Sequence, residues 1–327
     1  MSMRHRLSPP ACASAGWPSV AGVGDRYGGD VDDSAQPVTG VTPPRGRFVE
    51  VEDRRLWVDV REGPGPCVVF LPGSGEMGLD LWQSFDRLTR SRAGIIYDRA
   101  GTGWSSPVAL PRTAAAVAEE LEALLRAVDV QGHVVLVGHS LGGAYAQRFA
   151  QLFPDRVAGM VLLDPVHGAW NEAMPERLRI RANASASVVV TDEHRAAARQ
   201  WRESVTTDLP PRIRQLVRER HVADGLRTGP REGANFTEIL DELGPGPFAA
   251  PTVVLRAGAI DPLQAQFRSA DDLREQGDAL RHMYEEALPP GSLCRELPTA
   301  THSDIALLFS ADVADTVDDL DEVLRDR

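Results

Sequence analysis

The stretch HVVLVGHSLGGAYAQRFAQLFP, residues 133–154, reads as a strand, a sharp turn and a helix in immediate succession. Its first part is apolar and typical of a buried strand, whereas its last part is compatible with a helix. Between them, Ser140 is the central residue of a GxSxG pattern. Such a turn is so tight that small residues at Gly138 and Gly142 are needed to avoid clashes, and the serine hydroxyl stands exposed above the sheet. The stretch therefore predicts that Ser140 is a nucleophile.

The same rhythm of apolar strands and helices continues on both sides of this turn. Apolar runs typical of buried parallel strands occur at 67–71, 93–97, 158–163 and 251–255. The clearest helical stretch follows Thr113, with apolar residues at spacings of three and four. Upstream, alternating residues over 47–63 predict a β-hairpin around Asp53 and Arg54. We therefore expect an α/β fold whose mostly parallel central sheet is flanked by helices.

Two segments do not show the alternation of apolar strands and helices, and these segments define the domain organisation. Residues 1–44 are rich in Pro, Gly, Ser and Asp without any period, which predicts a flexible N-terminal extension. Residues 166–248 are polar, arginine-rich and mostly helical in tendency, which predicts an insertion. The expected core is thus 45–165 together with 249–327.

Composition excludes several classes of function. The net charge of −12 and the pI near 5.2 argue against a nucleic acid or an anionic membrane surface as partner. All 35 basic residues are arginine, so Schiff-base, P-loop and lysine-base chemistry is excluded. The three cysteines lie far apart, and neither a disulfide framework nor a zinc site is predicted. We expect no cofactor and no metal, and a small-molecule substrate.

A serine nucleophile needs a base, and His302 is the best placed of the eight histidines. It lies in the loop ATHSD, after a short strand predicted near Leu293 to Leu297 and immediately before the C-terminal helical segment. The base in turn needs a carboxylate that fixes its tautomer. Asp261 follows the strand at 251–255 and keeps the chain order Ser, Asp, His, so it is the preferred acid. Asp164, at the end of the strand at 158–163, stays open as the alternative.

The tetrahedral oxyanion of an acyl transfer needs two backbone N–H donors. One is expected from Leu141, directly after the nucleophile. The other is expected from the loop LPGSGEMG, with Ser74 preferred and Gly75 next. Within that loop a GxGxxG pattern begins at Gly73 and resembles a dinucleotide fingerprint, but the upstream hairpin and the hydrolytic constellation elsewhere argue against nucleotide binding.

With these residues in place, the chain resembles the α/β-hydrolase superfamily, in particular actinobacterial-type members with a DRAGxGxS loop, here residues 98–105. The resemblance covers about 46–327. It implies an α/β-hydrolase fold in which 166–248 form a cap over the active site, and a structural role for Asp98 and Arg99. One departure concerns the oxyanion loop, where Pro72 and Gly73 replace the commoner His-Gly.

The resemblance also narrows the reaction. Haloalkane dehalogenases and epoxide hydrolases use an aspartate nucleophile, and 166–248 contain no tyrosine to protonate an epoxide oxygen. Prolyl aminopeptidases usually differ in the sequence of the serine turn, called the elbow, which is Gly138–Gly142 here. Carbon–carbon bond hydrolases usually differ in the glycine-rich oxyanion loop. We expect a serine hydrolase that acts on an ester, thioester or lactone through an acyl-enzyme. A lyase, cyclase or acyltransferase with the same triad, and a non-catalytic ligand-binding protein, stay open as alternatives.

Two further expectations concern location and assembly. No apolar run approaches the roughly 20 residues of a membrane span. Pro9 and Pro10 interrupt the place where the apolar part of a signal peptide would follow Arg4 and Arg6. A cytoplasmic protein is therefore predicted, and the sequence leaves the oligomeric state open.

Overall fold

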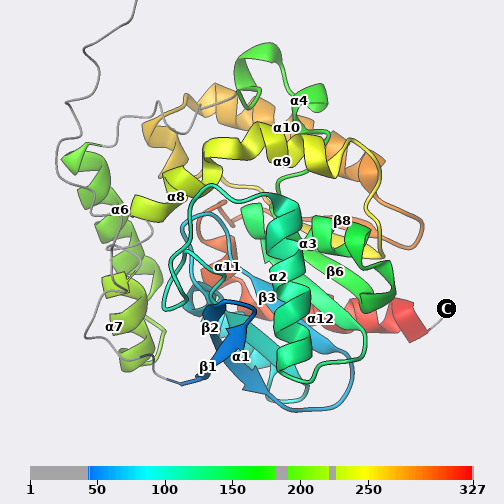
Figure 1. Ribbon diagram of the computed structural model, residues 1–327. Helices are drawn as coiled ribbons and strands as arrows, with labels where there is room; N and C mark the ends of the chain where they lie inside the picture. Colours follow the sequence, from blue (N-terminus) through cyan, green and yellow to red (C-terminus); the bar gives the residue numbers. More distant parts are fainter. Residues whose placement is uncertain (1–42, 44, 182–190, 221–225, 326–327) are drawn as a thin grey trace, which may run out of the picture. The chain divides into compact units, whose positions relative to one another are not determined.

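The computed structural model describes residues 43, 45–181, 191–220 and 226–325. The predicted N-terminal extension 1–44 lies almost entirely outside this part of the chain. Within it, eight strands form one sheet in the order β1-β2-β4-β3-β5-β6-β7-β8 (Figure 1). Their bounds are β1 Arg47–Val51, β2 Arg54–Arg61, β3 Cys67–Leu71, β4 Gly94–Tyr97, β5 Val134–His139, β6 Val157–Leu163, β7 Thr252–Ala257 and β8 Leu293–Leu297. The predicted α/β architecture is confirmed.

Only the first two strands depart from a parallel sheet. β1 pairs with β2, and β2 with β4, in antiparallel register, while all the other neighbours are parallel. β1 and β2 form the expected hairpin, whose turn places Glu52 at φ 54°. Because the other strands run in one direction, their carboxyl ends meet at one edge, where ligands bind in sheets of this kind.

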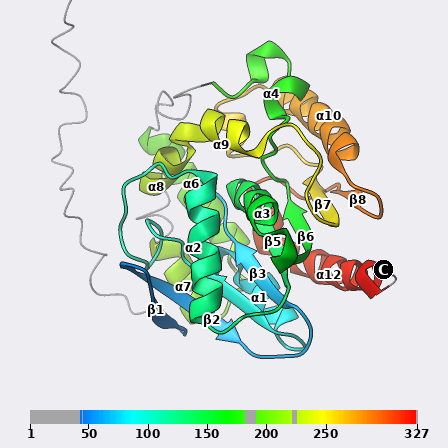
Figure 2. The same cartoon turned by 45° about the vertical axis from the view of Figure 1, so that its right-hand side comes forward.

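The sheet separates two hydrophobic cores. Along β3, Val69 and Leu71 face one core and Val68 and Phe70 the other, as the pleat of a strand buried on both faces requires. The first core contains residues from α2 (Ala114–Ala127), α3 (Leu141–Leu152), α9 (Phe236–Leu243) and α10 (Ala270–Ala287). The second contains residues from α1 (Trp82–Leu88), α11 (Ile305–Leu308) and α12 (Ser310–Arg325). Figure 2 shows α2 and α3 side by side over one face of the sheet.

Two helix starts illustrate how local chemistry sets the boundaries. α2 begins after Thr113, whose hydroxyl oxygen accepts a hydrogen bond from the backbone N–H of Ala116, as its capping position predicts. α10 begins after Ser269, whose hydroxyl oxygen accepts a hydrogen bond from the N–H of Asp272. Residues Gln264–Gln266 form a separate 3-10 turn.

The described part of the insertion is helical. It contains α4 (Trp170–Ala173), α6 (Asp192–Val205), α7 (Pro211–Arg220), α8 (Leu226–Glu232) and α9. Short 3-10 turns lie at Glu176–Leu178 and Gly233–Asn235, and others in the core at η1 (Gly78–Leu81) and at Pro154–Arg156. α9 is tied to the start of α2, because Glu242 accepts from the N–H groups of Ala114 and Ala115. The insertion thus packs on the core as well as extending from it.

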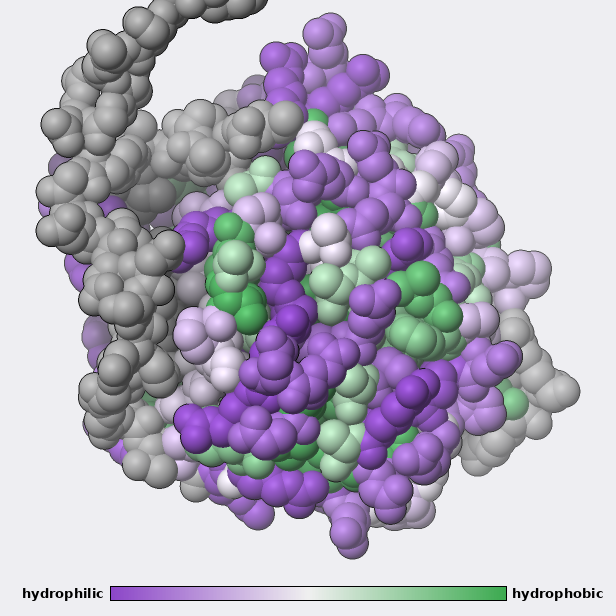
Figure 3. All heavy atoms as spheres, in the orientation of Figure 1, coloured by the Kyte–Doolittle hydropathy of each residue, from purple (hydrophilic) through white to green (hydrophobic). Residues whose placement is uncertain are grey.

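The surface of the described residues is mostly polar. In the view of Figure 3, hydrophilic residues predominate and the hydrophobic ones form small separate patches. Most buried apolar side chains lie in the two cores. In the part of the chain that the structure describes, no helix combines the length and apolar character that a membrane crossing requires.

Candidate active site

Ser140 lies at the sharp turn between β5 and α3. Its backbone has φ 50° and ψ −116°, a strained conformation for a residue with a side chain. A Cβ atom at Gly142 would come within 2.0 Å of the Leu71 carbonyl oxygen, and one at Gly138 within 2.7 Å of the Gly142 carbonyl oxygen. Both glycines are therefore needed for the tight approach, as the sequence pattern predicts.

His302 connects this serine to a carboxylate. Its Nε2 lies 3.1 Å from Ser140 Oγ, and its Nδ1 lies 2.6 Å from Asp164 Oδ2. The imidazole is about a quarter exposed, while the Asp164 side chain is 10% exposed. An Nδ1–H donated to the carboxylate leaves the Nε2 lone pair facing the serine hydroxyl, which is the tautomer that a general base needs.

The sequence favours Asp261 as the carboxylate partner of His302, and this prediction is wrong, because the imidazole contacts Asp164 instead. Asp261 is 4% exposed, and its Oδ1 accepts from the N–H groups of Leu263 and Gln264. Its Oδ2 accepts from the N–H of Ser303 at 2.6 Å. The carboxylate of Asp261 is therefore occupied by its own turn and by the residue after His302.

Strand order explains why Asp164 takes that place. β6 lies directly beside β5, whereas β7 is one strand further away. Asp164 follows β6 with φ 43°, its N–H donates to the Leu255 carbonyl and its Oδ1 accepts from Ala257 N–H. This fixed turn brings its second oxygen to His302.

The loop after β3 presents three consecutive amides, of which two are occupied. The N–H of Gly73 donates to Glu76, and the N–H of Gly75 donates to Glu232 at 2.7 Å. Among the described residues no hydrogen bond is found for the N–H of Ser74. The same holds for the N–H of Leu141, the first residue of α3, where helix geometry leaves the amide without an intrahelical partner. These are the two predicted oxyanion donors, and Gly75 is excluded as a donor by its contact with Glu232.

Sequence reasoning missed the buried pair Arg99–Glu232. Arg99 Nε and Nη2 donate to the Glu232 carboxylate at 2.6 and 2.8 Å, and both side chains are 2% exposed. Arg99 also donates to the carbonyls of Pro72 and Gly73. Although burial opposes its charge, the attraction of Glu232 raises the pKa of Arg99. The expected structural role of Arg99 thus extends to the oxyanion loop and α8. No local signal in the polar insertion singles out Glu232.

Asp98 behaves as its structural role predicts. Its Oδ1 accepts from the N–H of Gly78 and its Oδ2 from the N–H of Trp104. A Cβ atom at Gly103 would fall 2.0 Å from Oδ2, which explains the glycine in the DRAGxGxS loop. Asp98 therefore holds this loop against η1.

A second buried carboxylate missed by the sequence reasoning is Glu76. Its Oε2 lies 2.9 Å from Nδ1 of His139, the residue before Ser140. The other ring nitrogen of His139, Nε2, lies 2.9 Å from the backbone carbonyl oxygen of His302. Only the glycine-rich loop hinted at this region, and nothing in the sequence connected it with His139.

One cavity of about 290 Å³ borders Asp164, Asp261 and His302, so it reaches the carboxylate side of the contacts between Ser140, His302 and Asp164.

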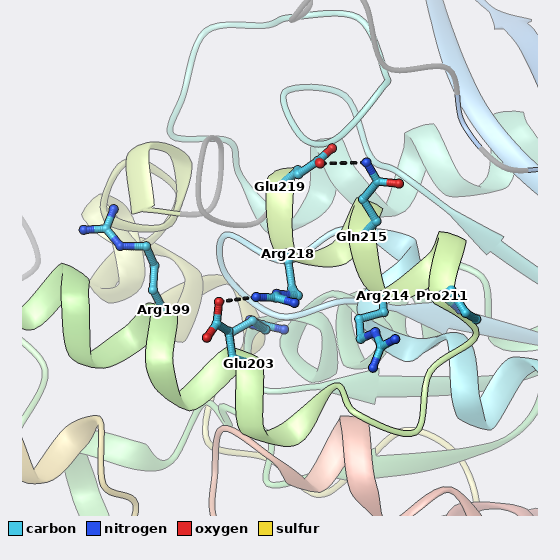
Figure 4. A pocket seen from close by; sticks show the side chains of 8 residues that line it. Arg199, Glu203, Pro211, Arg214, Gln215, Arg218 and Glu219 are labelled. Carbon is cyan, nitrogen blue, oxygen red and sulfur yellow. Dashed lines mark hydrogen bonds and ion pairs between the residues drawn. The ribbon is translucent and has the colours of Figure 1, made fainter.

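A second cavity, of about 400 Å³, lies at α6 and α7 (Figure 4). It is lined by Arg199, Arg202, Glu203, Pro211, Arg214, Gln215, Arg218 and Glu219. This lining does not include Ser140, Asp164 or His302, and Figure 4 shows Arg218 directed at Glu203 and Gln215 at Glu219. Among the described residues, no three His, Cys, Asp or Glu side chains converge as a metal site.

Comparisons with curated proteins find similarity over parts of the chain. A 119-residue stretch is 37% identical to polyketide synthase ThaQ of Burkholderia thailandensis, covering 36% of this chain and 6% of ThaQ. A 139-residue stretch is 30% identical to 2-(acetamidomethylene)succinate hydrolase of Mesorhizobium japonicum, covering 42% of this chain and 49% of that enzyme. The matches thus span less than half the length of these relatives.

Solved structures and family models extend the likeness to most of the chain. An esterase of Thermogutta terrifontis superposes with a TM-score of 0.53 at 19% identity, covering 85% of this chain and 99% of the esterase. That likeness concerns the fold. A family model described as alpha/beta hydrolase fold matches residues 66–293, which include the sheet from β3 to the first residue of β8 and the serine elbow. The chain therefore belongs to the alpha/beta hydrolase fold family.

Proposed function

We propose that this protein is a serine hydrolase that cleaves an ester, thioester or lactone of a small organic molecule through an acyl-enzyme. The observation that carries the proposal is the continuous chain of contacts from Ser140 Oγ through His302 to Asp164. The named hydrolase among the relatives is consistent with it.

In the proposed mechanism Ser140 Oγ attacks the substrate carbonyl while His302 Nε2 takes its proton. Asp164 holds the imidazole through Nδ1 and stabilises the imidazolium that forms. The N–H groups of Leu141 and Ser74 receive the oxyanion, and the N-terminal end of α3 adds a favourable dipole. His302 then protonates the leaving group, and water, activated by the same base, releases the acyl group.

We assign residues 166–248 the role of a cap. Ser74 Oγ donates to the Gly229 carbonyl, and Glu232 contacts Gly75, so the α8 segment meets the oxyanion loop directly. A cap that covers this loop excludes water and selects the acyl or alcohol part of the substrate.

The test is labelling by a fluorophosphonate probe combined with turnover of a panel of p-nitrophenyl esters and lactones. We expect one label per chain, located at Ser140 by peptide mass, and no label or turnover in Ser140→Ala. Ser204→Ala, which removes an exposed hydroxyl on α6, is the matched control and should behave as the wild type.

The outcomes separate the competing functions. Absence of labelling in the folded wild type would favour a ligand-binding protein. Labelling with products that lack the added water, detected by mass spectrometry, would favour elimination, cyclisation or acyl transfer. Turnover by Ser140→Ala at the wild-type rate would remove the serine from the mechanism.

A further inference from the structure

His139 is buried between three loops that carry proposed reacting groups. It is 3% exposed, and its two ring nitrogens contact Glu76 Oε2 and the His302 carbonyl oxygen, each at 2.9 Å. Glu76 is 8% exposed, and the same Oε2 accepts from the N–H of Gly73 at 2.5 Å. The His139–Glu76 pair thus connects three segments: the loop after β3, which contains Gly73, the loop after β8, which contains His302, and the turn after β5, which contains Ser140.

The chemistry of the partners fixes where the protons lie. A carbonyl oxygen only accepts hydrogen bonds, so His139 Nε2 must carry a hydrogen. Glu76 Oε2 already accepts from the Gly73 amide, which favours the ionised carboxylate and an Nδ1–H on His139. Burial opposes both charges, but their mutual attraction prevails and raises the pKa of His139 while lowering that of Glu76. The pair is therefore an imidazolium and a carboxylate.

We propose that His139 and Glu76 are positioning residues that hold the base loop and the oxyanion loop in register with the nucleophile. The inference rests on the proposed serine-hydrolase function. Neither residue contacts Ser140 Oγ in the geometry above, so both act through their neighbours. His139 adjoins Ser140, Gly73 adjoins Ser74, and the carbonyl that His139 binds belongs to His302 itself.

The ion pair packs closely against Gly73. A Cβ atom at Gly73 would fall 2.9 Å from both Glu76 Oε2 and His139 Nδ1. The glycine in the oxyanion loop is thus required by the ion pair as well as by access to the substrate. Acyl transfer depends on such fixed donors, because each must already point to where charge develops.

The ring of His139 also lies beside the ring of His302, with the two ring centroids 5.1 Å apart. Two further carboxylates act on the ion pair: Asp164, at the end of β6, adds to the raised pKa of His139, and Asp80, in η1, opposes the lowered pKa of Glu76. His139 therefore lies against both the backbone and the ring of the proposed base.

The test compares His139→Gln and Glu76→Gln with the wild type. Both variants keep hydrogen-bonding side chains and remove the charge pair. We expect kcat to fall by roughly 10- to 100-fold with KM changed little, since an imprecise site loses mainly transition-state stabilisation. His133→Gln, an exposed histidine just before β5, is the matched control.

Each outcome decides between the two proposals. Wild-type kcat in folded His139→Gln would overturn the positioning role while the serine-hydrolase function stands. Lack of turnover and of probe labelling in the wild type would instead overturn the function. If His139→Gln fails to fold, Glu76→Gln, which replaces one oxygen by an amide nitrogen, still shows whether loss of the charge pair lowers kcat at an unchanged KM.

Discussion

At the scale of single residues, two carboxylates compete for the same histidine. Asp164 and Asp261 both follow a parallel strand and both end close to the 302–303 segment. One oxygen of Asp164 accepts from the N–H of Ala257, and the other contacts the imidazole. Both oxygens of Asp261 instead accept hydrogen bonds from backbone amides. Asp261 thereby anchors the loop that carries His302, and Asp164 contacts the ring.

This difference predicts unequal effects of the same substitution. Asp164→Asn should lower kcat by roughly 10³- to 10⁴-fold, because the amide no longer stabilises the imidazolium or enforces its tautomer. Asp261→Asn should cause a far smaller loss, since it weakens loop contacts only. Steady-state kinetics on the best ester of the panel measure both variants, with circular dichroism as the check on folding. The reverse order of effects would return the acid's role to Asp261.

At the scale of elements, the Arg99–Glu232 pair joins the loop after β4 to α8 and the oxyanion loop. Removing one partner leaves a buried charge without its counter-ion, which typically costs about 3–5 kcal/mol. Glu232→Met should therefore lower the free energy of unfolding strongly, and Arg99→Met should do the same. The double variant should cost less than the sum of the two, because it leaves neither charge stranded. Urea denaturation of the four proteins gives this coupling.

An exposed pair of the same type provides the control for that cycle. Arg177 and Glu275 also form an ion pair, but both of their side chains are about half exposed. Glu275→Met should leave the urea midpoint near the wild-type value, since solvent screens such pairs. Strict additivity of the Arg99 and Glu232 variants would contradict the proposed link between α8 and the oxyanion loop.

At the scale of the whole molecule, one buried histidine makes stability depend on pH. His167 is 2% exposed, its Nδ1 accepts from the N–H of Ala169 and its ring packs edge-on against Phe248. Burial lowers the pKa of His167 to about 4, against the weaker opposing effect of a backbone hydrogen bond with Gly246. The folded protein therefore keeps this imidazole neutral at pH values where the unfolded chain binds a proton.

The sign of the pH effect follows from that difference. Above pH 6.5 both states are neutral at His167, and between 6.5 and 4 the unfolded chain gains the extra proton, so stability falls as the pH is lowered. The total loss from this group is about 3 kcal/mol once the pH reaches 4. Denaturation of the wild type and His167→Gln from pH 7 to 4 measures it, because the variant should lose less stability by that amount. Parallel pH curves for the two proteins would show that His167 does not titrate in this way.

The amino-acid sequence by itself determined most of the elements and the sharp turn that carries Ser140, the proposed nucleophile. These features could be predicted because each depends on only a few neighbouring residues. Examples are the strand periodicity, the helix cap at Thr113 and the glycines around Ser140. His302 could be singled out because it alone among the histidines follows the last strand. The α/β architecture follows from the alternation of these elements along the chain.

Only the tertiary structure decided which distant groups meet. The partner of His302 depends on the order β5-β6-β7, which places Asp164 on the neighbouring strand, and the chain order Ser, Asp, His carries no information on that distance. The contacts of Glu76 with His139 and of Arg99 with Glu232 join residues 63 and 133 positions apart. Such pairs arise because the carboxyl ends of parallel strands converge at one edge of the sheet. Local sequence patterns do not indicate which side chains from different strands come into contact at that edge.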